Sequence, residues 1–374
     1  MSEESGSTYK VPMTKILKIN EHPNADRLEI ATVYGFQVIV KKDTYSEGDE
    51  VLYVPIDSVL PQDIEDHLFP PEAKIKLHKH RIKQIRIRKI ASQGMLIPIA
   101  EMETVKDIRI RELEGDYSEK LGITKYEPPT RGSSFGTVGK KIKKNEHSQF
   151  DKFGGLNNIK WFPSMFTSEE EIVLQEKIHG TNARAGKLKY EANTILKKIK
   201  KLFKLTPEYV FCYGSNNMQL QEHNDHKGYY GENIYGQVFS GINVEEKLDN
   251  GEIVYGEIYG EGVQKNYSYG TREKKFILFD VKKDGKWLSP DEVCEFAKLR
   301  GFDLVPEIYR GPFKDLDHVK SHSLGASILA PSQKVREGVV VKALHNYNNK
   351  GDAGKRALKI ISEKYLDKEQ TDFH

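Results

Sequence analysis

A segment rich in proline, glycine, serine and lysine separates two differently patterned regions, and this division constrains the fold more than any other feature. It runs over Lys125–Ser148 (KYEPPTRGSSFGTVGKKIKKNEHS), a composition typical of a linker or exposed loop. At roughly 100–200 residues per domain, a chain of 374 residues predicts two domains. We therefore predict a first domain over residues 1–128, a linker over 129–147 and a second domain over 148–374.

Short strands dominate the first region. The stretches RLEIATVYGFQVIVKK and EVLYVPIDSVLP are rich in β-branched and aromatic residues, and SEGDE lies between them as a turn. The stretch RIKQIRIRKIASQGMLIPI continues the β-type pattern. Several short strands with turn signals and no clear helix predict a small β-barrel.

The second region mixes strands and helices. EIVLQEKI, EIVYGEIYG, KKFILFDVK and REGVVVKAL predict strands, whereas DEVCEFAKLRGF and ILKKIKKLFKL predict helices. The last of these, residues 195–205, is basic and amphipathic, and we interpret it as a surface helix rather than an RNA contact. The whole chain is therefore expected to be an α+β multidomain protein.

Composition limits the partners and the compartment. The net charge is only +3, so any surface that binds nucleic acid must be local. The two cysteines, Cys212 and Cys294, provide no disulfide framework and fit a reducing compartment. The first ten residues lack the apolar stretch of a signal peptide, and no apolar run reaches the ~20 residues of a membrane span. We expect an intracellular protein without a membrane span.

One lysine stands where a predicted strand ends. In VLQEKIHGTNARAGKL, Lys177 is followed by His179 and Gly180. A lysine in such a place is usually a solvated surface charge. Four further stretches follow it in order, and each places a charged or aromatic residue in a predicted strand: Glu257 in VYGEIYG, Phe279 and Asp280 in FILFDVK, Glu337 in REGVVVK, and Lys359 in RALKIISEKYL.

Together and in this order, these stretches resemble the covalent nucleotidyltransferases, which comprise RNA ligases, DNA ligases and mRNA capping enzymes. The motif Lys-x-His-Gly-Thr-Asn resembles the RNA ligase 2-like group, whereas DNA ligases and capping enzymes typically have Lys-x-Asp-Gly. The resemblance covers about Phe150–Leu366. Because only fifteen residues follow Lys359, we expect no C-terminal OB domain. The β-rich domain instead precedes the nucleotidyltransferase motifs, and this domain order resembles the branch of RNA ligases with an N-terminal OB domain.

The resemblance implies a fold and a reaction. An N-terminal OB-like β-barrel would precede an ATP-grasp-like nucleotidyltransferase domain with antiparallel sheets and flanking helices. Lys177 would form lysyl–AMP with ATP and release pyrophosphate. The AMP would pass to an RNA 5′-phosphate, and a 3′-OH would then displace it. The expected partner is RNA with such ends, in a nicked duplex during RNA repair, and the expected state is a monomer.

The resemblance also implies roles for individual residues. Phe279 would stack on one face of adenine and Val340 would close the other, while His179 would act near the phosphates after lysine adenylylation. The implied catalytic residues are Lys177, His179, Glu257, Glu337 and Lys359. The implied nucleotide-binding residues are Glu176, Lys177, Ile178, Asn182, Arg184, Asn216, Glu257, Phe279, Val340, Lys342 and Lys359.

The chemistry of the lysine predicts what must surround it. An amine attacks phosphorus only when it is uncharged, so the pKa of Lys177 must fall. Nearby positive charge lowers it, and Lys359 together with a metal bound near Glu257, Asp280 and Glu337 would serve. Carboxylates suit Mg²⁺ or Mn²⁺, which would also offset the charge that develops on the α-phosphate.

Two positions depart from the family pattern. Members often have an arginine where FCYGSNNMQL has Asn216, and a second lysine where this chain has Ile361. Lys342 or Lys364 could supply the second charge.

A basic run predicts the RNA contact. Residues Lys74–Lys89 (KIKLHKHRIKQIRIRK) contain no acidic residue, and Ile82, Ile85 and Ile87 could anchor them so that the basic side chains face outward. The predicted RNA-binding residues are Arg81, Lys83, Arg86 and Arg88. The nearby stretch HPNADRLEIATV resembles a segment of tRNA-binding OB domains, although a turn followed by a strand explains it equally well.

Two alternative functions follow from the same residues. A DNA ligase or a GTP-using capping enzyme is disfavoured by His179 and by the expected absence of a C-terminal OB domain. A nucleic-acid-binding protein with an inactive nucleotidyltransferase fold is disfavoured by the intact Lys177, Glu257, Asp280 and Glu337.

Overall fold

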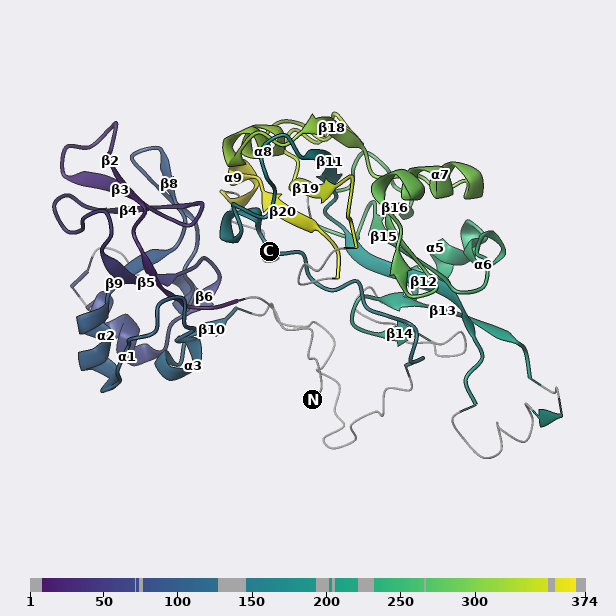
Figure 1. Cartoon of the computed structure of the whole chain (residues 1–374), viewed down its shortest axis with the longest axis horizontal. Helices are drawn as coiled ribbons and strands as arrows, with labels where there is room; N and C mark the ends of the chain where they lie inside the picture. The colour runs from purple at the N-terminus through teal and green to yellow at the C-terminus, as the bar shows by residue number, and fades with distance from the viewer. Residues whose placement is uncertain are drawn as a thin grey trace. The chain divides into compact units, whose positions relative to one another are not determined.

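The computed structural model of the chain describes residues 9–70, 72–73, 77–126, 146–192, 202–203, 206–220, 232–265, 267–348 and 354–367. They fall into two compact units (Figure 1). Unit 1 takes its residues from Met1–Pro129, Ile159–Met165 and Glu363–His374, and unit 2 from Thr130–Asn158 and Phe166–Ser362. Nearly all of the predicted linker and of the basic helix over 195–205 lies outside the described residues. No helix in the described ranges has the length and apolar character needed to cross a membrane.

Unit 1 is a small antiparallel β structure, as the OB-like prediction requires. Its strands form the sheets β1-β5-β9 and β2-β3-β4 and the pairs β10-β6 and β7-β8. The strands are β1 (Met13–Lys15), β2 (Lys18–Glu21), β3 (Leu28–Val33), β4 (Phe36–Lys41), β5 (Glu50–Val54), β6 (Ser58–Val59), β7 (Ile85–Ile87), β8 (Ile90–Ser92), β9 (Met95–Pro98) and β10 (Thr124–Lys125).

Unit 1 also contains short helices, which the sequence pattern does not indicate. They are α1 (Gln62–Leu68), α2 (Ile99–Lys106), α3 (Ser118–Leu121), α9 (Glu363–Leu366) and the 3₁₀ turns η1 (His78–His80) and η2 (Ile159–Trp161). Each of α1, α2, α3 and α9 buries a single residue, respectively Ile64, Met102, Leu121 and Tyr365. One buried position leaves no helical period to detect in a sequence.

A segment from later in the chain completes the core of unit 1. In β4 the inward residues Phe36, Val38 and Val40 alternate with more exposed ones, as expected for a strand with one buried face. The ring of Trp161 packs on this face, with its centroid 5.0 Å from that of Phe36 and 5.4 Å from that of Tyr53. The turn around Trp161 therefore belongs structurally to the N-terminal unit.

The predicted basic run does not face outward as a whole. Ile82 is buried as expected, but Ile85 is 46% exposed. Arg81 is buried: its guanidinium binds Asp57 Oδ1 at 2.5 Å and lies 3.9 Å from the ring centroid of Tyr126. The prediction that Arg81 presents its charge to RNA is wrong, because an acidic residue 24 positions earlier neutralises it inside the unit.

Unit 2 contains two antiparallel sheets, β18-β11-β19-β20 and β14-β13-β12-β15-β16-β17. Its strands are β11 (Glu171–Lys177), β12 (Thr181–Lys189), β13 (Tyr209–Ser215), β14 (Gln219–Leu220), β15 (Glu252–Tyr259), β16 (Lys275–Lys283), β17 (Lys286–Trp287), β18 (Glu307–Pro312), β19 (Gly338–Ala343) and β20 (Ala357–Ile361). The strands predicted from EIVLQEKI, EIVYGEIYG, KKFILFDVK and REGVVVKAL are β11, β15, β16 and β19, and are confirmed.

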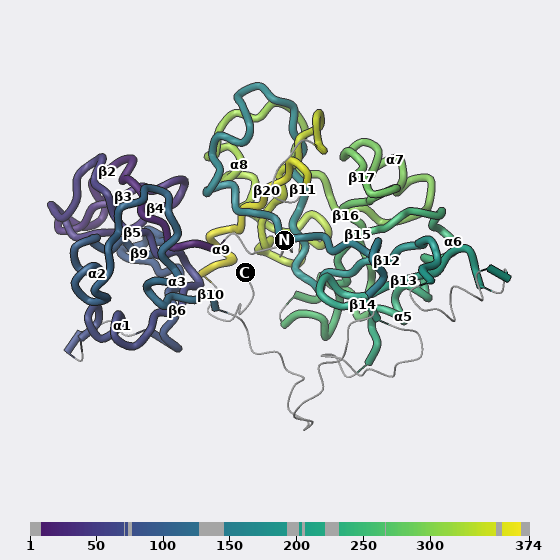
Figure 2. Tube along the Cα trace, turned by 60° about the horizontal axis from the view of Figure 1, so that its bottom comes forward, coloured from purple at the N-terminus to yellow at the C-terminus, as the bar shows by residue number. Residues whose placement is uncertain are grey.

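Helices cover one face of the six-stranded sheet. They are α5 (Ile234–Gly241), α6 (Val244–Lys247) and α7 (Pro290–Arg300), whereas α8 (Leu316–Ser323) lies beside the four-stranded sheet (Figures 1 and 2). Helix α7 is the one predicted from DEVCEFAKLRGF. A capping box between Ser289 and Glu292 starts it, and Gly301 in the left-handed conformation ends it.

The opposite face of the six-stranded sheet is covered by aromatic residues. Tyr255 of β15 packs there with Phe150, Phe153 and Trp287 in one buried cluster. The segment around Phe150–Leu156 thus lies over the strands that carry the motif residues. It leaves the neighbouring part of this face for a cavity.

Arg81 should be required for the stability of unit 1. We expect Arg81→Ala to lower the free energy of unfolding by about 2–4 kcal/mol, since it leaves Asp57 charged and half of a buried pair missing. Exposed Arg88→Ala is the control and should change it by no more than about 0.5 kcal/mol. Urea unfolding, monitored by hydrogen exchange of the backbone in β5 and β6, measures the change in free energy of unfolding for both variants. Equal stability of the two variants would contradict a structural role for Arg81.

Candidate active site

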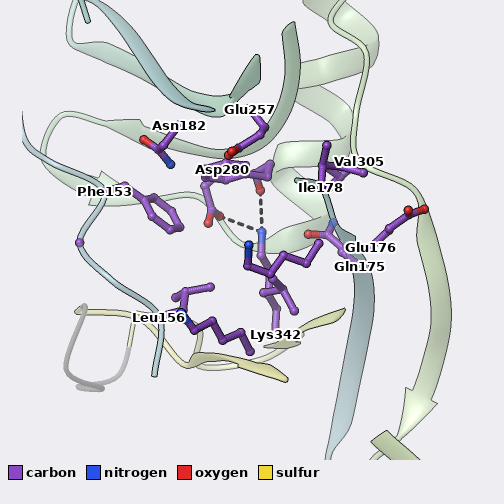
Figure 3. A pocket seen from close by; sticks show the side chains of 15 residues that line it. Phe153, Leu156, Gln175, Glu176, Ile178, Asn182, Glu257, Asp280, Val305 and Lys342 are labelled. Atoms are coloured by element: carbon purple, nitrogen blue, oxygen red, sulfur yellow. Dashed lines mark hydrogen bonds and ion pairs between the residues drawn. The ribbon is translucent and has the colours of Figure 1, made fainter. Parts of the chain in front are cut away.

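A cavity with about 700 Å³ of empty space, part of it open to solvent, lies between the two sheets of unit 2. Figure 3 shows Asn182 and Glu257 on one side of it and Leu156 and Lys342 on the other. The lining residues are Phe153, Gly154, Leu156, Gln175, Glu176, Lys177, Ile178, Asn182, Glu257, Phe279, Asp280, Val305, Val340, Lys342 and Lys359. All residues predicted to contact the nucleotide are in this set except Arg184 and Asn216.

Strand pairing brings distant residues to one wall of the cavity. In the four-stranded sheet, Val340 lies opposite Gln175 on β11 and opposite Lys359 on β20. Because side chains alternate along a strand, Val340 and Lys342 share the cavity face while Val339 and Val341 are fully buried on the other. The pairing explains how residues 175, 340 and 359 become neighbours.

A β-bulge places Phe279 and Asp280 together. Tyr255 pairs with Asp280 and Gly256 with Leu278, so Phe279 has no partner across the ladder. Consecutive residues of a regular strand point to opposite faces, but a bulge breaks that alternation. Phe279 and Asp280 consequently both line the cavity.

Lys177 is held in an ion pair. Its Nζ lies 2.5 Å from Glu337 Oε1, and Lys177 pairs across the sheet with Gly338, the residue after Glu337. Burial by itself lowers the pKa of Lys177, but the charges of Glu337 and Glu257 and the hydrogen bond to Glu337 together outweigh it and raise the pKa. The expectation of a lowered pKa is therefore wrong for the protein without ligands.

Glu257 faces the same ammonium group. Burial, and after it the charge of Glu337, raise the pKa of Glu257 to about 8, although Lys177 opposes the shift. The carboxyl groups of Glu257 and Glu337 thus both lie close to Lys177 in a buried site. Asn182 pairs across the sheet with Glu257, and its Oδ1 is buried without a hydrogen-bond partner among the described residues. These groups are arranged to accept polar contacts from a ligand.

Asp280 does not join Glu257 and Glu337 in a metal site. Its Oδ1 lies 3.1 Å from Lys342 Nζ and its Oδ2 2.8 Å from Lys355 Nζ, and Tyr347 Oη donates to Oδ1 at 3.0 Å. Burial alone would raise the pKa of Asp280, but the two lysines outweigh it and lower the pKa. The prediction that all three carboxylates hold one metal is therefore wrong.

Glu257 and Glu337 nevertheless fit a divalent cation. In the described part of the chain, no group of three or more metal-binding residues occurs. Glu337 Oε2 is buried there without a hydrogen-bond partner, and His179 Nδ1 lies 3.8 Å from it. Mg²⁺-type ions usually take one or two carboxylates and complete their shell with water and substrate phosphates. Two acidic side chains, one with an oxygen that makes no hydrogen bond, meet that requirement.

Sequence reasoning missed Lys355, which contacts two residues that line the cavity, Asp280 and Phe153. Its ammonium is fully buried, pairs with Asp280, and lies 3.5 Å from the ring centroid of Phe153 and 3.7 Å from that of Trp287. Phe153 in turn packs edge-on against Phe279, with centroids 4.7 Å apart. No motif identifies Lys355, because its partners come from two distant segments, the one around Phe153 and the β16–β17 hairpin.

Arg184 and Asn216 do not line the cavity, so their predicted nucleotide contacts have no support in the geometry. The fully buried Arg184 donates to the carbonyl oxygens of Phe150 and Ser215. Asn216 Oδ1 accepts the N–H of Phe153 at 3.0 Å. Both residues instead hold the segment that brings Phe153 to the cavity.

The remaining predicted residues take varied positions. Glu176 Oε2 accepts the N–H groups of Ile328 and Leu329, so its carboxylate anchors that loop although the residue lines the cavity. Lys342 lines the cavity whereas Ile361 does not, which favours Lys342 as the second charge. Lys364, the other candidate, lies in α9 of unit 1.

His179 and Gly180 form the turn after Lys177. A Cβ on Gly180 would lie 2.2 Å from the carbonyl oxygen of Ile258, so only glycine fits against β15. His179 is 7% exposed, and its Nδ1 lies 3.8 Å from Glu337 Oε2. The turn therefore holds His179 beside the Lys177–Glu337 pair but outside the residues that line the cavity.

Comparison with known proteins agrees with this geometry. A family model described as RNA ligase matches residues 170–361, and an OB-fold domain model matches residues 10–99. The chain belongs to the RNA ligase family. None of the curated proteins matches it.

Solved structures of Naegleria gruberi RNA ligase share the fold. A point mutant with ATP and Mn is 20% identical, with a TM-score of 0.72 over 96% of this chain and 99% of that one. A second mutant with ATP and Mn is 19% identical, with a TM-score of 0.73 over 96% and 99%. A structure with PPi is 20% identical, with a TM-score of 0.71 over 96% and 98%. The likeness extends over both units.

The raised pKa of Glu257 predicts a pH-dependent stability. Between the unfolded value of about 4.3 and the folded value of about 8, the folded protein holds a proton that the unfolded chain releases, so stability falls as pH rises. Relative to the native protein, Glu257→Gln should gain up to about 1.4 kcal/mol per pH unit between pH 5 and 8. Urea unfolding at several pH values measures the difference. A constant difference would show that Glu257 is ionised throughout this range.

Proposed function

We propose that this protein is an ATP-dependent RNA ligase that joins RNA 3′-OH and 5′-phosphate ends. The observation that carries the proposal is Lys177, which lines a cavity beside Glu257 and pairs with Glu337 within the region matched by the RNA ligase family. ATP as the nucleotide is supported by the related ligase structures solved with ATP. The proposed setting is RNA repair inside the cell, on nicked duplexes.

In the first step, Lys177 Nζ would attack the α-phosphorus of ATP. A phosphorus–nitrogen bond forms, the bond to pyrophosphate breaks, and the amine loses a proton. Glu337 accepts the hydrogen bond of Nζ and so aims the amine into the cavity. Phe279 and Val340 line the cavity from the two sheets and would enclose adenine, while Asn182 would bind the ribose.

Loss of the lysine proton requires that the negative charge around it be offset. Lys342 and Lys359 line the cavity and carry positive charge toward the phosphates. Glu337, and Glu257 once it has released its proton, would hold Mg²⁺ or Mn²⁺, which would offset both carboxylates and the developing charge on the α-phosphate. Mn in the related ligase structures supports this.

In the later steps, AMP would move from Lys177 to the RNA 5′-phosphate, which breaks the phosphorus–nitrogen bond and forms a pyrophosphate linkage. The RNA 3′-OH would then attack the same 5′-phosphorus, lose its proton and release AMP. His179 is placed 3.8 Å from Glu337 and outside the cavity lining, which fits a role on the RNA side of the reaction.

A hairpin of unit 1 offers a surface for RNA phosphates. Strands β7 and β8 are joined by Arg88 and Lys89, whose φ angles are +48° and +76°. Such angles cost roughly 1–2 kcal/mol for residues other than glycine, and strain of this kind is often kept for function. His22 Nε2 contacts the Ile87 carbonyl oxygen at 3.1 Å, and Asn24 donates to that of Arg88 at 2.9 Å, so the tip is held in place.

The charge at this tip is available to a partner. Arg88 and Lys89 are exposed, and no acidic residue occurs in the sequence between Glu72 and Glu101. Arg86 on β7 is partly neutralised by Asp367 at 2.7 Å, and Lys83 is half-buried. We therefore assign most of the RNA attraction to Arg88 and Lys89, with Arg86 and Lys83 as supporting charges.

Lys177→Ala should abolish labelling of the protein by AMP and sealing of 5′-phosphate RNA, yet leave some joining of pre-adenylated RNA, because that step needs no lysine nucleophile. Incubation with radioactive ATP or GTP measures the labelling of the protein. EDTA should stop the labelling of the native protein by ATP. Labelling by GTP alone would favour a capping enzyme. Absence of any label in the native protein would favour a non-catalytic nucleic-acid-binding protein. Label retained by Lys177→Ala would exclude the assigned nucleophile.

Replacing both Arg88 and Lys89 with glutamine should weaken binding of nicked RNA and reduce its salt dependence by about two phosphate contacts. Self-adenylylation should not change, because neither residue lies in unit 2. The matched control replaces Arg109 and Lys120, two exposed charges of the same unit; Lys120 lies in α3, away from β8 (Figure 1). Fluorescence anisotropy at several salt concentrations gives the slopes, and equal slopes would refute the assignment.

A further inference from the structure

A loop of unit 2 contacts the His179–Gly180 turn through three side chains. It connects β15, which carries Glu257, with β16, which carries Phe279. The backbone N–H of His179 donates to Tyr269 Oη at 2.7 Å. Gln264 Nε2 donates to the Gly180 carbonyl oxygen at 2.6 Å. The ring of Tyr267 meets the imidazole edge-on, with centroids 4.8 Å apart and an angle of 83°.

Tyr267 and Tyr269, which contact His179, are themselves held in place by neighbouring residues. Tyr267 and Tyr269 are 2% and 6% exposed. Tyr267 Oη donates to the Val335 carbonyl oxygen at 3.3 Å, two residues before Glu337. Tyr269 packs edge-on against Tyr259 at 5.5 Å and has a left-handed φ of +51°, a conformation that a bulky residue adopts only when its surroundings require it.

This arrangement does more than fill space. A buried backbone N–H needs an acceptor, and in a strand a neighbouring carbonyl group normally supplies it. Here Tyr269 and Gln264, two side chains of one loop, make hydrogen bonds to the backbone of the consecutive residues 179 and 180. Tyr267 of the same loop contacts the imidazole of His179. The loop thus fixes the direction of the imidazole, whose Nδ1 lies 3.8 Å from Oε2 of Glu337, the partner of Lys177.

We propose that Tyr267 and Tyr269 are positioning residues for His179, and that they set the imidazole for the RNA-directed steps rather than for lysine adenylylation. The inference rests on the ligase function proposed above. His179, Tyr267 and Tyr269 are not among the residues that line the nucleotide cavity. A displaced imidazole therefore leaves the walls around ATP intact and affects the steps that use RNA.

The test measures two rates in the full-length protein: formation of lysyl–AMP from ATP, and sealing of a pre-adenylated nicked RNA. Tyr267→Leu removes the ring and should slow sealing roughly 10–100-fold, since a misplacement of about 1 Å costs up to two orders of magnitude. Tyr269→Phe, which removes the acceptor for His179 N–H, should slow it in the same direction. Lysyl–AMP formation should stay within about threefold. Tyr267→Phe keeps the ring and should restore sealing.

Tyr235→Phe is the matched control. Its hydroxyl shares a hydrogen bond of 2.9 Å with Thr181 Oγ1, so the variant also loses one hydroxyl contact near the turn, but none to His179. Both rates should be unchanged in it. The NMR signals of the His179 imidazole should move in Tyr267→Leu and stay in Tyr235→Phe, a measurement that needs no activity.

A His179→Ala background separates positioning from general support of the fold. If the tyrosines act through His179, Tyr267→Leu should add almost nothing to the sealing defect of His179→Ala. Additive effects, or equal loss of both rates in Tyr267→Leu, would overturn the proposal. Unmoved imidazole signals would overturn it independently of activity. Absence of AMP labelling in the native protein would instead contradict the ligase function, so the two failures are distinguishable.

Discussion

The ion pair between Lys177 and Glu337, 2.5 Å long, is the interaction on which the site depends. It exists because β11 and β19 pair in one register, with Lys177 opposite Gly338. A slip by one residue would turn Lys177 away from the cavity, since side chains alternate along a strand. Leu174, Val339 and Val341, all fully buried, oppose such a slip because it would expose them to the cavity face. The apolar packing of the sheet therefore fixes where the reactive amine lies.

Electrostatics then decides the state of that amine. Glu337 and Glu257 keep Lys177 protonated, and a nucleotide would bring further negative charge that favours the same protonated form. Nucleophilic attack consequently needs positive charge from elsewhere in the site. Lys342 and Lys359 line the cavity, but Lys342 is already paired with Asp280. This shortage of free positive charge is the physical reason for assigning a divalent cation to the two glutamates.

The sequence predicts those parts of the site that depend on short-range pattern. Strand ends, their order and the glycine after the lysine indicate where Lys177, Glu257 and Val340 lie, and the cavity includes all three. Long-range contacts decide the rest. Asn182 and Arg184 lie two apart on one face of β12, yet the Phe150 segment covers only Arg184. The sequence around Arg81 predicts a surface cation, but the structure places Asp57 beside it. Neither partner is visible in a local pattern.

The path of the chain affects how the two units can be studied separately. Trp161 lies in the sequence between Phe153, which lines the cavity, and Lys177, but it packs on Phe36 and Tyr53 of unit 1. The segment from Glu363 follows Lys359 closely and also belongs to unit 1, where Gln84 donates to Asp367 at 2.8 Å. A fragment that ends before residue 130 would lose both segments and expose the aromatic cluster around Tyr53. Loss of RNA binding in such a fragment would therefore reflect damaged folding, whereas substitution of exposed charges leaves the core of unit 1 intact.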